Sequence, residues 1–344
     1  MPHHALFVFF DVTALAIAPL VTTIMSTRSA THAGDWYTAD AGRLDKQLTT
    51  WLAAVDGSTL GYSLPVRGCK AIIAPCNMLA THTPVPRPLG LTELSMWRTC
   101  IKRVVLLGPS HHVYLDGCAL SQCSSYATPI GDIPLDTETI SALRATGKFS
   151  DLTQDADEDE HSLEMHLPYI RKVFQDRDIV LTPVLVGSIS MASEASYGAL
   201  LAPYLERPDT LTVVSSDFCH WGQRFSYTYY RSGESANPIH LSRSLGPASE
   251  YPIHASIEAL DREAMSILTL PSDEPDCHGV FSAYLSRTKN TICGRHPIGV
   301  LLGSMAALKK QGGQEIQWTR YEQSSKCLTV RDSSVSYASA WVKF

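Results

Sequence analysis

The sequence predicts an α/β fold, a single domain with a mostly parallel central sheet flanked by helices. Short continuous apolar runs, such as residues 70–75 and 103–109, are typical of strands that are buried on both faces of a sheet. Segments with apolar residues at helical spacing alternate with these runs along the chain. Such strand–helix alternation is typical of a parallel sheet that is covered by helices.

The individual elements follow from local spacing and from capping residues. Leu44 and Leu48 recur at helical spacing and predict a first helix over 42–55. A second helix is predicted to open at the capping residue Asp136 and to close at Gly147. Further expected strands are 179–187, 211–218, 316–324 and 334–344, further helices are 160–174, 192–206, 256–268, 278–288 and 297–312, and a Gly-, Ser- and Pro-rich surface loop is 231–252.

The overall composition limits the class of protein. The chain has 344 residues, of which 44% are hydrophobic and 18% charged, as in ordinary soluble globular proteins. A net charge of −6 gives no general attraction to nucleic acid or to anionic lipid, so we expect neither as a partner. The nine cysteines form no close pairs and no zinc pattern, which favours a reduced, cytosolic setting.

The N-terminal segment needs a separate interpretation. Residues 6–25 are apolar enough for a signal peptide, but they contain Asp11 and Pro19, and the first basic residue is Arg28. A membrane-spanning helix would lose about 2–3 kcal/mol to the central aspartate. We therefore expect residues 1–24 to be a non-core extension and 25–344 to be the single domain. The alternative is a weak targeting segment.

Polar residues follow the predicted strands directly, where α/β sheets bind ligands. His111 and His112 follow one strand, and Asp217 and His220 follow another. Taken singly, each of these has a structural explanation, such as capping a helix or packing in the core. Further polar groups are His32, Asp35, Trp36 and Tyr37; His161, Glu164 and His166; and Cys293, Arg295 and His296. Together, a thiol and imidazoles suit iron, copper or zinc, and a histidine beside an aspartate suits proton transfer.

Six long segments resemble the Memo family: "HAGDWYTA", "GPSHHV", "TQDADEDEHSLEMHLPY", "SSDFCHWGQRF", "NTICGRHPIGVLL" and "DSSVSYAS". The family is similar in fold to the class III extradiol dioxygenases of the LigB type, non-haem iron enzymes with two histidines and one carboxylate on the metal. The Memo family has a cysteine in place of that carboxylate. The resemblance implies bound iron or copper, roles in redox signalling and cell motility, binding of phosphotyrosine peptides, and a cytoplasmic or nuclear location.

The resemblance also implies roles for particular residues. His111 and Cys293 are expected as metal ligands. His220, with Asp217, is expected to line the pocket where the dioxygenases keep their acid–base histidine, and Trp36 is expected as a binding residue at the rim. The third ligand of the family is a histidine directly after "IIAP". This chain has Cys76 there, which makes Cys76 the provisional third ligand.

Residues 77–99 follow Cys76 and have neither a strand period nor a helix period. Suppose that Asn77 is encoded AAC, the next eight residues ATG CTG GCT ACT CAT ACT CCG GTC, and the next codon begins CC. A frame that starts at the last base of the Asn77 codon then reads HAGYSYSGP, the kind of segment that holds the missing histidine. We interpret 77–99 as a frame-shifted or mis-spliced segment. The alternative is a divergent insertion in which Cys76 or His82 is the ligand, and a cDNA sequence would distinguish the two.

Two classes of function follow from the resemblance. The first is a metal-dependent redox protein that reduces copper, or reduces dioxygen to superoxide or peroxide. Ring cleavage is disfavoured because the carboxylate ligand is missing, and whether the protein is an enzyme stays open. Metal binding by this exact chain is expected to be weakened, because one histidine is missing. The second class is a non-enzymatic adaptor that binds a phosphotyrosine peptide or a signalling protein in the same pocket.

Overall fold

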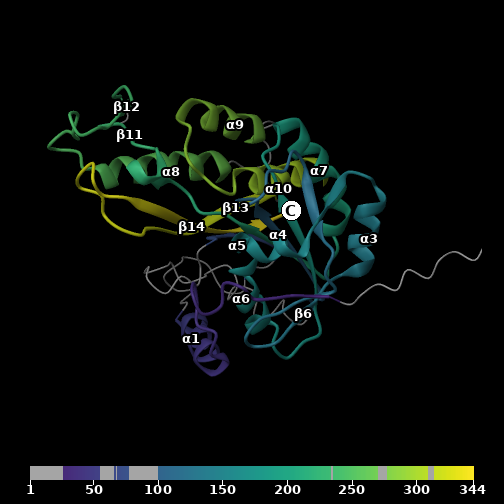
Figure 1. Ribbon diagram of the computed structural model, residues 1–344. Coiled ribbons are helices and arrows are strands. Elements are labelled where there is room, and N and C mark those ends of the chain that lie inside the picture. The colour runs from purple at the N-terminus through teal and green to yellow at the C-terminus, as the bar shows by residue number, and fades with distance from the viewer. Residues whose placement is uncertain are drawn as a thin grey trace, which may run out of the picture.

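The structure is a computed structural model that describes residues 26–54, 66, 68–76, 100–233, 235–269, 277–308 and 314–344. The predicted N-terminal extension, 1–24, and the predicted frame-shifted segment, 77–99, lie outside the described residues. Figure 1 shows a central sheet with helices on both sides, which confirms the predicted α/β fold.

The central sheet has the strand order β10-β14-β2-β9-β3-β8-β4-β7, with β13 paired to β14. Its strands are β2 (Cys69–Ala74), β3 (Arg103–Pro109), β4 (Cys118–Ser121), β7 (Phe149–Leu152), β8 (Val180–Val186), β9 (Thr210–Ser215), β10 (His220–Trp221), β13 (Glu315–Gln323) and β14 (Ser334–Lys343). The four central strands, β2, β9, β3 and β8, run parallel, as the sequence predicted. The sheet becomes mixed toward its edges, because β14 is antiparallel to its three neighbours and β4 is antiparallel to β8.

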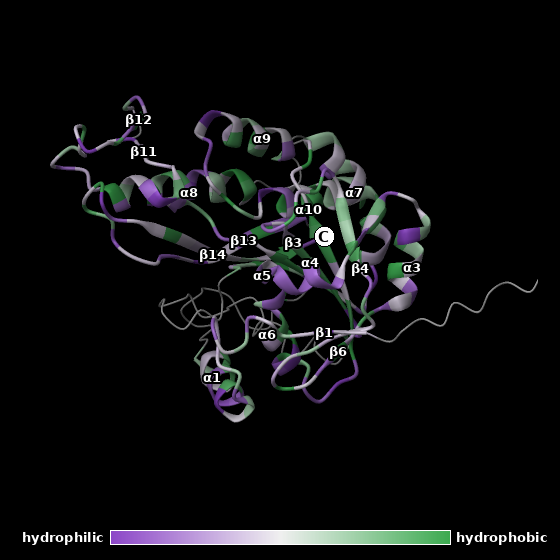
Figure 2. Cartoon of the chain, in the orientation of Figure 1, coloured by the Kyte–Doolittle hydropathy of each residue, from purple (hydrophilic) through white to green (hydrophobic). Residues whose placement is uncertain are grey.

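The parallel centre is apolar on both faces. Val104 and Leu106 of β3 and Val213 of β9 are fully buried, and the strands there are green in the hydropathy colouring of Figure 2. Burial of each such side chain contributes about 1.5–3 kcal/mol. This explains why the sequence shows continuous apolar runs here instead of alternation.

Helices cover both faces of the sheet. They are α1 (Ala41–Ala53), α3 (Thr137–Ala145), α4 (Gln154–Asp159), α5 (His161–Glu164), α6 (Leu167–Val173), α7 (Met191–Leu205), α8 (Ile253–Thr269), α9 (Cys277–Thr288) and α10 (Arg295–Leu308). In Figure 1, α7, α9 and α10 lie together above the sheet and α1 and α6 lie below it. α7 and α10 pack closely because Gly198 has no side chain; a Cβ there would lie 2.5 Å from the backbone of Gly303.

The single helix predicted over 160–174 is divided in the structure. α5 ends at Glu164 and α6 begins at Leu167, with Pro168 in its first turn. Proline has no backbone N–H and clashes with the preceding turn, so a continuous helix through Pro168 is disfavoured. The division leaves α5 as a short helix whose N-cap is Glu160.

The remaining strands are short: β1 (Thr27–Arg28), β5 (Ser125–Tyr126), β6 (Ile133–Pro134), β11 (Tyr229–Tyr230) and β12 (Ile239–His240). β12 lies inside the predicted surface loop 231–252 and pairs with β11. Within the described ranges, none of the helices combines the length and apolar character that crossing a membrane requires.

Candidate functional site

Three adjacent strands of the parallel centre end at the candidate site. Cys76 follows β2, Asp217 follows β9 and His111 follows β3. Because β2, β9 and β3 are parallel neighbours, their carboxyl ends meet at one edge of the sheet. Cys293, in the turn before α10, reaches the same edge, where its backbone N–H donates to the carbonyl of Asp217 (3.3 Å). The tertiary structure thus brings together the polar residues that the sequence placed after separate strands.

The two cysteines form a close thiol pair. The Sγ atoms of Cys76 and Cys293 lie 3.2 Å apart. The backbone N–H of Asp217 also donates to Cys293 Sγ, at 3.1 Å. Burial opposes ionisation of Cys293, but hydrogen bonds from Cys76 and His111 outweigh it and hold the pKa of its thiol well below the ordinary value. Burial and the neighbouring Cys293 raise the pKa of Cys76. The two shifts favour Cys293 as the thiolate of the pair and Cys76 as its thiol partner.

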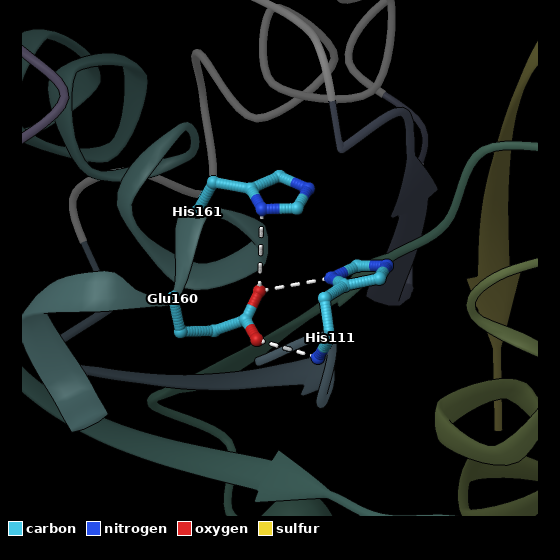
Figure 3. A group of neighbouring side chains, drawn as sticks. All are labelled: His111, Glu160 and His161. Atoms are coloured by element: carbon cyan, nitrogen blue, oxygen red, sulfur yellow. Dashed lines mark hydrogen bonds and ion pairs between the residues drawn. The ribbon is translucent and has the colours of Figure 1, made fainter. Parts of the chain in front are cut away.

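The imidazole of His111 is held from both sides. Its Nδ1 lies 2.9 Å from Glu160 Oε1, and its backbone N–H donates to Glu160 Oε2 at 2.7 Å (Figure 3). Since Nδ1 is bonded to Glu160, the hydrogen bond between His111 and Cys293 is assigned to Nε2. Burial favours the neutral ring, but the bonds to Cys293 and Glu160 outweigh it and raise the pKa of His111 to about 10. Burial likewise opposes ionisation of Glu160, but His111 lowers its pKa to about 2.

His161 completes a group of three side chains that could hold a metal. Its Nδ1 lies 3.6 Å from Glu160 Oε1, and its ring stacks on His111 with centroids 4.4 Å apart. Figure 3 shows both imidazoles beside the Glu160 carboxylate. The possible ligand atoms of the three residues lie within 4.8 Å of one another. Burial and then the charge of His111 lower the pKa of His161 to about 4, so its ring is neutral near pH 7.

A close approach of α5 to β3 places these histidines together. A Cβ on Gly108 would lie 2.7 Å from the side chains of Ser162 and Leu163, so only glycine fits there. The Ser162 hydroxyl donates to the Pro109 carbonyl at 2.8 Å. The ring of Trp36 lies against that of His161, with centroids 4.7 Å apart and planes tilted by 30°. The structure thus places Trp36 beside the site.

A buried ion network fixes the segment that carries Glu160. Arg28 is fully buried; its Nη1 donates to Glu164 at 2.7 Å, its Nη2 donates to the Glu160 carbonyl at 3.0 Å, and its Nε pairs with Asp157 at 3.2 Å. Tyr37 and His32 also bond to Glu164. Glu164, which the sequence suggested as a site residue, therefore has a structural role here.

His166, the third residue of that group in the sequence, lies away from the site. It is fully buried, and burial lowers the pKa of its ring to about 3. Among the described residues, neither of its ring nitrogens has a hydrogen-bond partner. Of the group His161, Glu164 and His166, only His161 reaches the ligand atoms.

His220 lies across a pocket of about 350 Å³ that it lines together with His111 and Cys293. Its Nδ1 is 2.9 Å from the carbonyl of Phe218 and 3.0 Å from that of Thr291. Because carbonyls only accept hydrogen bonds, Nδ1 carries a hydrogen, which leaves Nε2 as the ring nitrogen available to the pocket. Asp217 is buried beside this pocket.

Known proteins match this chain over most of its length. The sequence profile described as "Memo-like protein" matches residues 28–341 of the chain. The chain belongs to the Memo family. The curated Memo-family "Protein MEMO1" of Xenopus tropicalis is 41% identical over 320 residues, which cover 90% of this chain and 95% of that protein. The "Protein MEMO1" of Danio rerio is 42% identical over 323 residues, which cover 91% and 96%.

A more distant Memo relative is the "Protein memo-1 homolog" of Caenorhabditis elegans, 38% identical over 315 residues that cover 91% of this chain and 81% of that protein. Among solved structures, an uncharacterised protein of Escherichia coli K12 aligns with a TM-score of 0.44 and 15% identity over 77% of this chain and 98% of the other. The profile match and the curated relatives confirm the family that the sequence segments indicated.

Glu160 is the residue of this Memo site that sequence reasoning missed. Glu160 caps α5 by accepting from the Ser162 N–H at 2.9 Å. The same carboxylate also holds His111, 49 positions away in the sequence. The one sequence signal for Glu160 was its position directly before His161. Local spacing cannot distinguish a carboxylate that caps a helix from one that binds a distant histidine.

Proposed function

We propose that this Memo-family chain is a metal-binding redox protein of redox and motility signalling in the cytoplasm or nucleus. It would hold iron or copper through His111 Nε2 and the sulfurs of Cys293 and Cys76. One observation carries the proposal. Glu160 holds the His111 ring at Nδ1 so that Nε2 faces Cys293, whose sulfur lies 3.2 Å from that of Cys76.

The donor set fits a metal. A histidine that binds a metal usually donates its other ring N–H to a carboxylate, and His111 donates Nδ1–H to Glu160. Glu160 itself is already engaged: Oε1 also accepts from the Ser162 N–H, and Oε2 accepts from the His111 N–H. These bonds support an orienting role for Glu160 and a metal position on the opposite, thiol side of the His111 ring.

The chemistry of the donors favours copper(I) or iron(II), because thiolates are soft ligands. When bound, the ion would supply one-electron chemistry: an external reductant would reduce it to copper(I) or iron(II), and the reduced ion would give one electron to dioxygen to form superoxide, two of which yield peroxide and dioxygen. The chain's own groups supply the proton chemistry. His220 Nε2, with its lone pair in the pocket, can accept and return a proton, and the Asp217 N–H steadies the Cys293 sulfur. Because Cys293 takes the place of the carboxylate ligand of the dioxygenases, ring cleavage is not proposed.

An adaptor function is the second proposal, in which the same pocket binds a phosphotyrosine peptide of a signalling protein. Arg295 lines the pocket and Trp36 lies beside the site. An arginine suits a phosphate, and an aromatic side chain suits the tyrosine ring. The two functions would share one surface, so variants of the metal ligands can separate them.

Competition titration with copper(I), together with metal analysis of the purified chain, tests the first proposal. Wild type should bind up to one equivalent, and His111→Ala or Cys293→Ser should lose it. Cys277→Ser is the matched control, because Cys277 lies in α9 with its sulfur bonded to the Ile267 carbonyl. Metal binding that survives both ligand variants would refute the proposed site. Loss of metal with unchanged phosphotyrosine-peptide binding would leave the adaptor function alone.

A further inference from the structure

A second pocket lies beside the metal pocket. It has a volume of about 560 Å³ and is formed by the ends of α7, α9 and α10. Thr291, Arg295 and His296 line both pockets, so these three residues form the wall between them. The other lining residues come from segments that the proposed metal site does not use.

A carboxylate bridges two imidazoles in this second pocket. Glu194 Oε1 lies 2.6 Å from His296 Nδ1, and Oε2 lies 2.5 Å from His278 Nε2. Burial opposes ionisation of Glu194, but the two histidine bonds outweigh it and lower its pKa. A Cβ on Gly299 would lie 2.3 Å from Glu194 Oε2, so α10 closes over the carboxylate. The two imidazoles therefore cover the negative charge of Glu194.

Cationic groups line another part of the pocket wall. Lys289 and Arg295 line it, and it receives the N-terminal ends of two long helices, α7 and α10. Lys289 also has a positive φ of 53°, a conformation that favours glycine. These groups together suit a bound anion.

Two buried acceptor atoms in the wall have no hydrogen-bond partner among the described residues. They are Asn290 Oδ1 and His296 Nε2. Asn290 is only 4% exposed, and its Nδ2 donates to Asp261 Oδ1 at 3.0 Å and to the Tyr284 hydroxyl at 2.8 Å, which fixes the direction of Oδ1. Since Glu194 holds His296 at Nδ1, the tautomer with its hydrogen on Nδ1 has Nε2 as the acceptor. A ligand that satisfies both atoms must bring hydrogen-bond donors.

We propose that this second pocket binds a small organic anion that carries hydroxyl groups next to a phosphate or carboxylate. Lys289 and Arg295 would hold the anionic group, and Asn290 Oδ1 and His296 Nε2 would accept from the hydroxyls. The volume is that of a small-molecule site. This proposal does not depend on the proposed metal function.

Isothermal titration calorimetry of the full chain tests the proposal with four probes: glycerol 3-phosphate, glycerate, inorganic phosphate and glycerol. At least one of the two hydroxylated anions should bind with a stoichiometry of one. Inorganic phosphate should bind about tenfold more weakly or worse, because it leaves the two acceptors unsatisfied. Glycerol should give no binding. A preference between glycerol 3-phosphate and glycerate identifies the anionic group.

Three variants locate the binding. Ser286→Trp, at an exposed lining position, should abolish binding while the melting temperature stays unchanged. Lys289→Gln should weaken binding about tenfold, whereas Lys148→Gln, an exposed control, should not. His111→Ala should leave binding unchanged. No binding of either hydroxylated anion, full binding by Ser286→Trp, or loss of binding in His111→Ala would each overturn the proposal.

Discussion

The protein contains two arrangements in which a buried carboxylate lies between two histidines. Glu160 lies between His111 and His161, and Glu194 lies between His278 and His296. Glu160 also accepts two backbone N–H groups, whereas Glu194 holds one imidazole on each oxygen. The surroundings differ too, because thiols lie beyond the first pair and cations lie beyond the second.

The difference indicates how one local pattern could serve the two kinds of chemistry that we propose. A carboxylate fixes the tautomer and the direction of an imidazole. The groups near the other ring nitrogen then decide which ligand the imidazole can bind. The free nitrogen of His111 faces a thiolate, which suits a soft metal. That of His296 lies in a cationic pocket wall, which suits a hydroxylated anion. The following experiments test this contrast, from the largest expected effect to the smallest.

Arg28→Met should disrupt the buried ion network that fixes the segment carrying Glu160. The change leaves Asp157 and Glu164 buried without their cation, so the free energy of unfolding should fall by about 3–5 kcal/mol in urea denaturation. Arg144→Gln is the control, because its pair with Asp151 is exposed and should contribute about 1 kcal/mol or less. Equal losses in both variants would show that the buried network does not support the segment.

Glu160→Gln and Glu194→Gln separate the two carboxylates by function. Glu160→Gln should weaken copper(I) affinity by about 10–100-fold, because His111 loses the acceptor that orients its ring. Glu194→Gln should leave copper affinity unchanged, since its imidazoles lie beyond the shared wall. Competition titration measures both, and equal effects would contradict the division of roles.

Gly299→Ala tests how tightly the second carboxylate is enclosed. The new methyl would meet Oε2 of the Glu194 carboxylate. Each oxygen of this carboxylate is bonded to one imidazole, so it cannot move aside easily, and the free energy of unfolding should fall by about 1–3 kcal/mol. Gly42→Ala is the control: its Cβ would lie 3.6 Å from Asp40 Oδ1, an ordinary contact, so stability should hold or rise. If thermal unfolding shows no difference between the two variants, Glu194 has room to move.

The first arrangement should also give a pH dependence in the metal-free protein. The pKa of Glu160 is about 2, below the ordinary 4.5, so its contribution is lost as pH falls from 4.5 toward 2. The pKa of His111 is about 10, above the ordinary 6.5, so its contribution is lost as pH rises from 6.5 toward 10. Wild type should therefore exceed His111→Gln in stability most between pH 4.5 and 6.5, by about 1 kcal/mol. A difference that is flat across pH would contradict the ion pair.

Sequence patterns alone determined the α/β fold, the strands of the parallel centre, and the family. A strand that is buried on both faces is apolar along most of its length, so β3 and β9 could be predicted from short apolar runs in the sequence. The positions after these strands also pointed to His111, Asp217 and His220, because parallel strands end at one edge. The strand β14 was predicted over 334–344, but its antiparallel place between β10 and β2 was not, since strand order depends on pairings between distant segments.

The tertiary structure alone decided which polar residues meet and which serve the fold. "DEDEHSLEMH" gives no local difference between Glu160 and Glu164, yet the first orients His111 and the second pairs with Arg28. Likewise His278, Glu194 and His296 come from three helices that are separated by more than 80 and by 18 positions, so no spacing marks them. Contacts of this kind depend on how helices pack on the sheet, and a linear pattern does not contain that information.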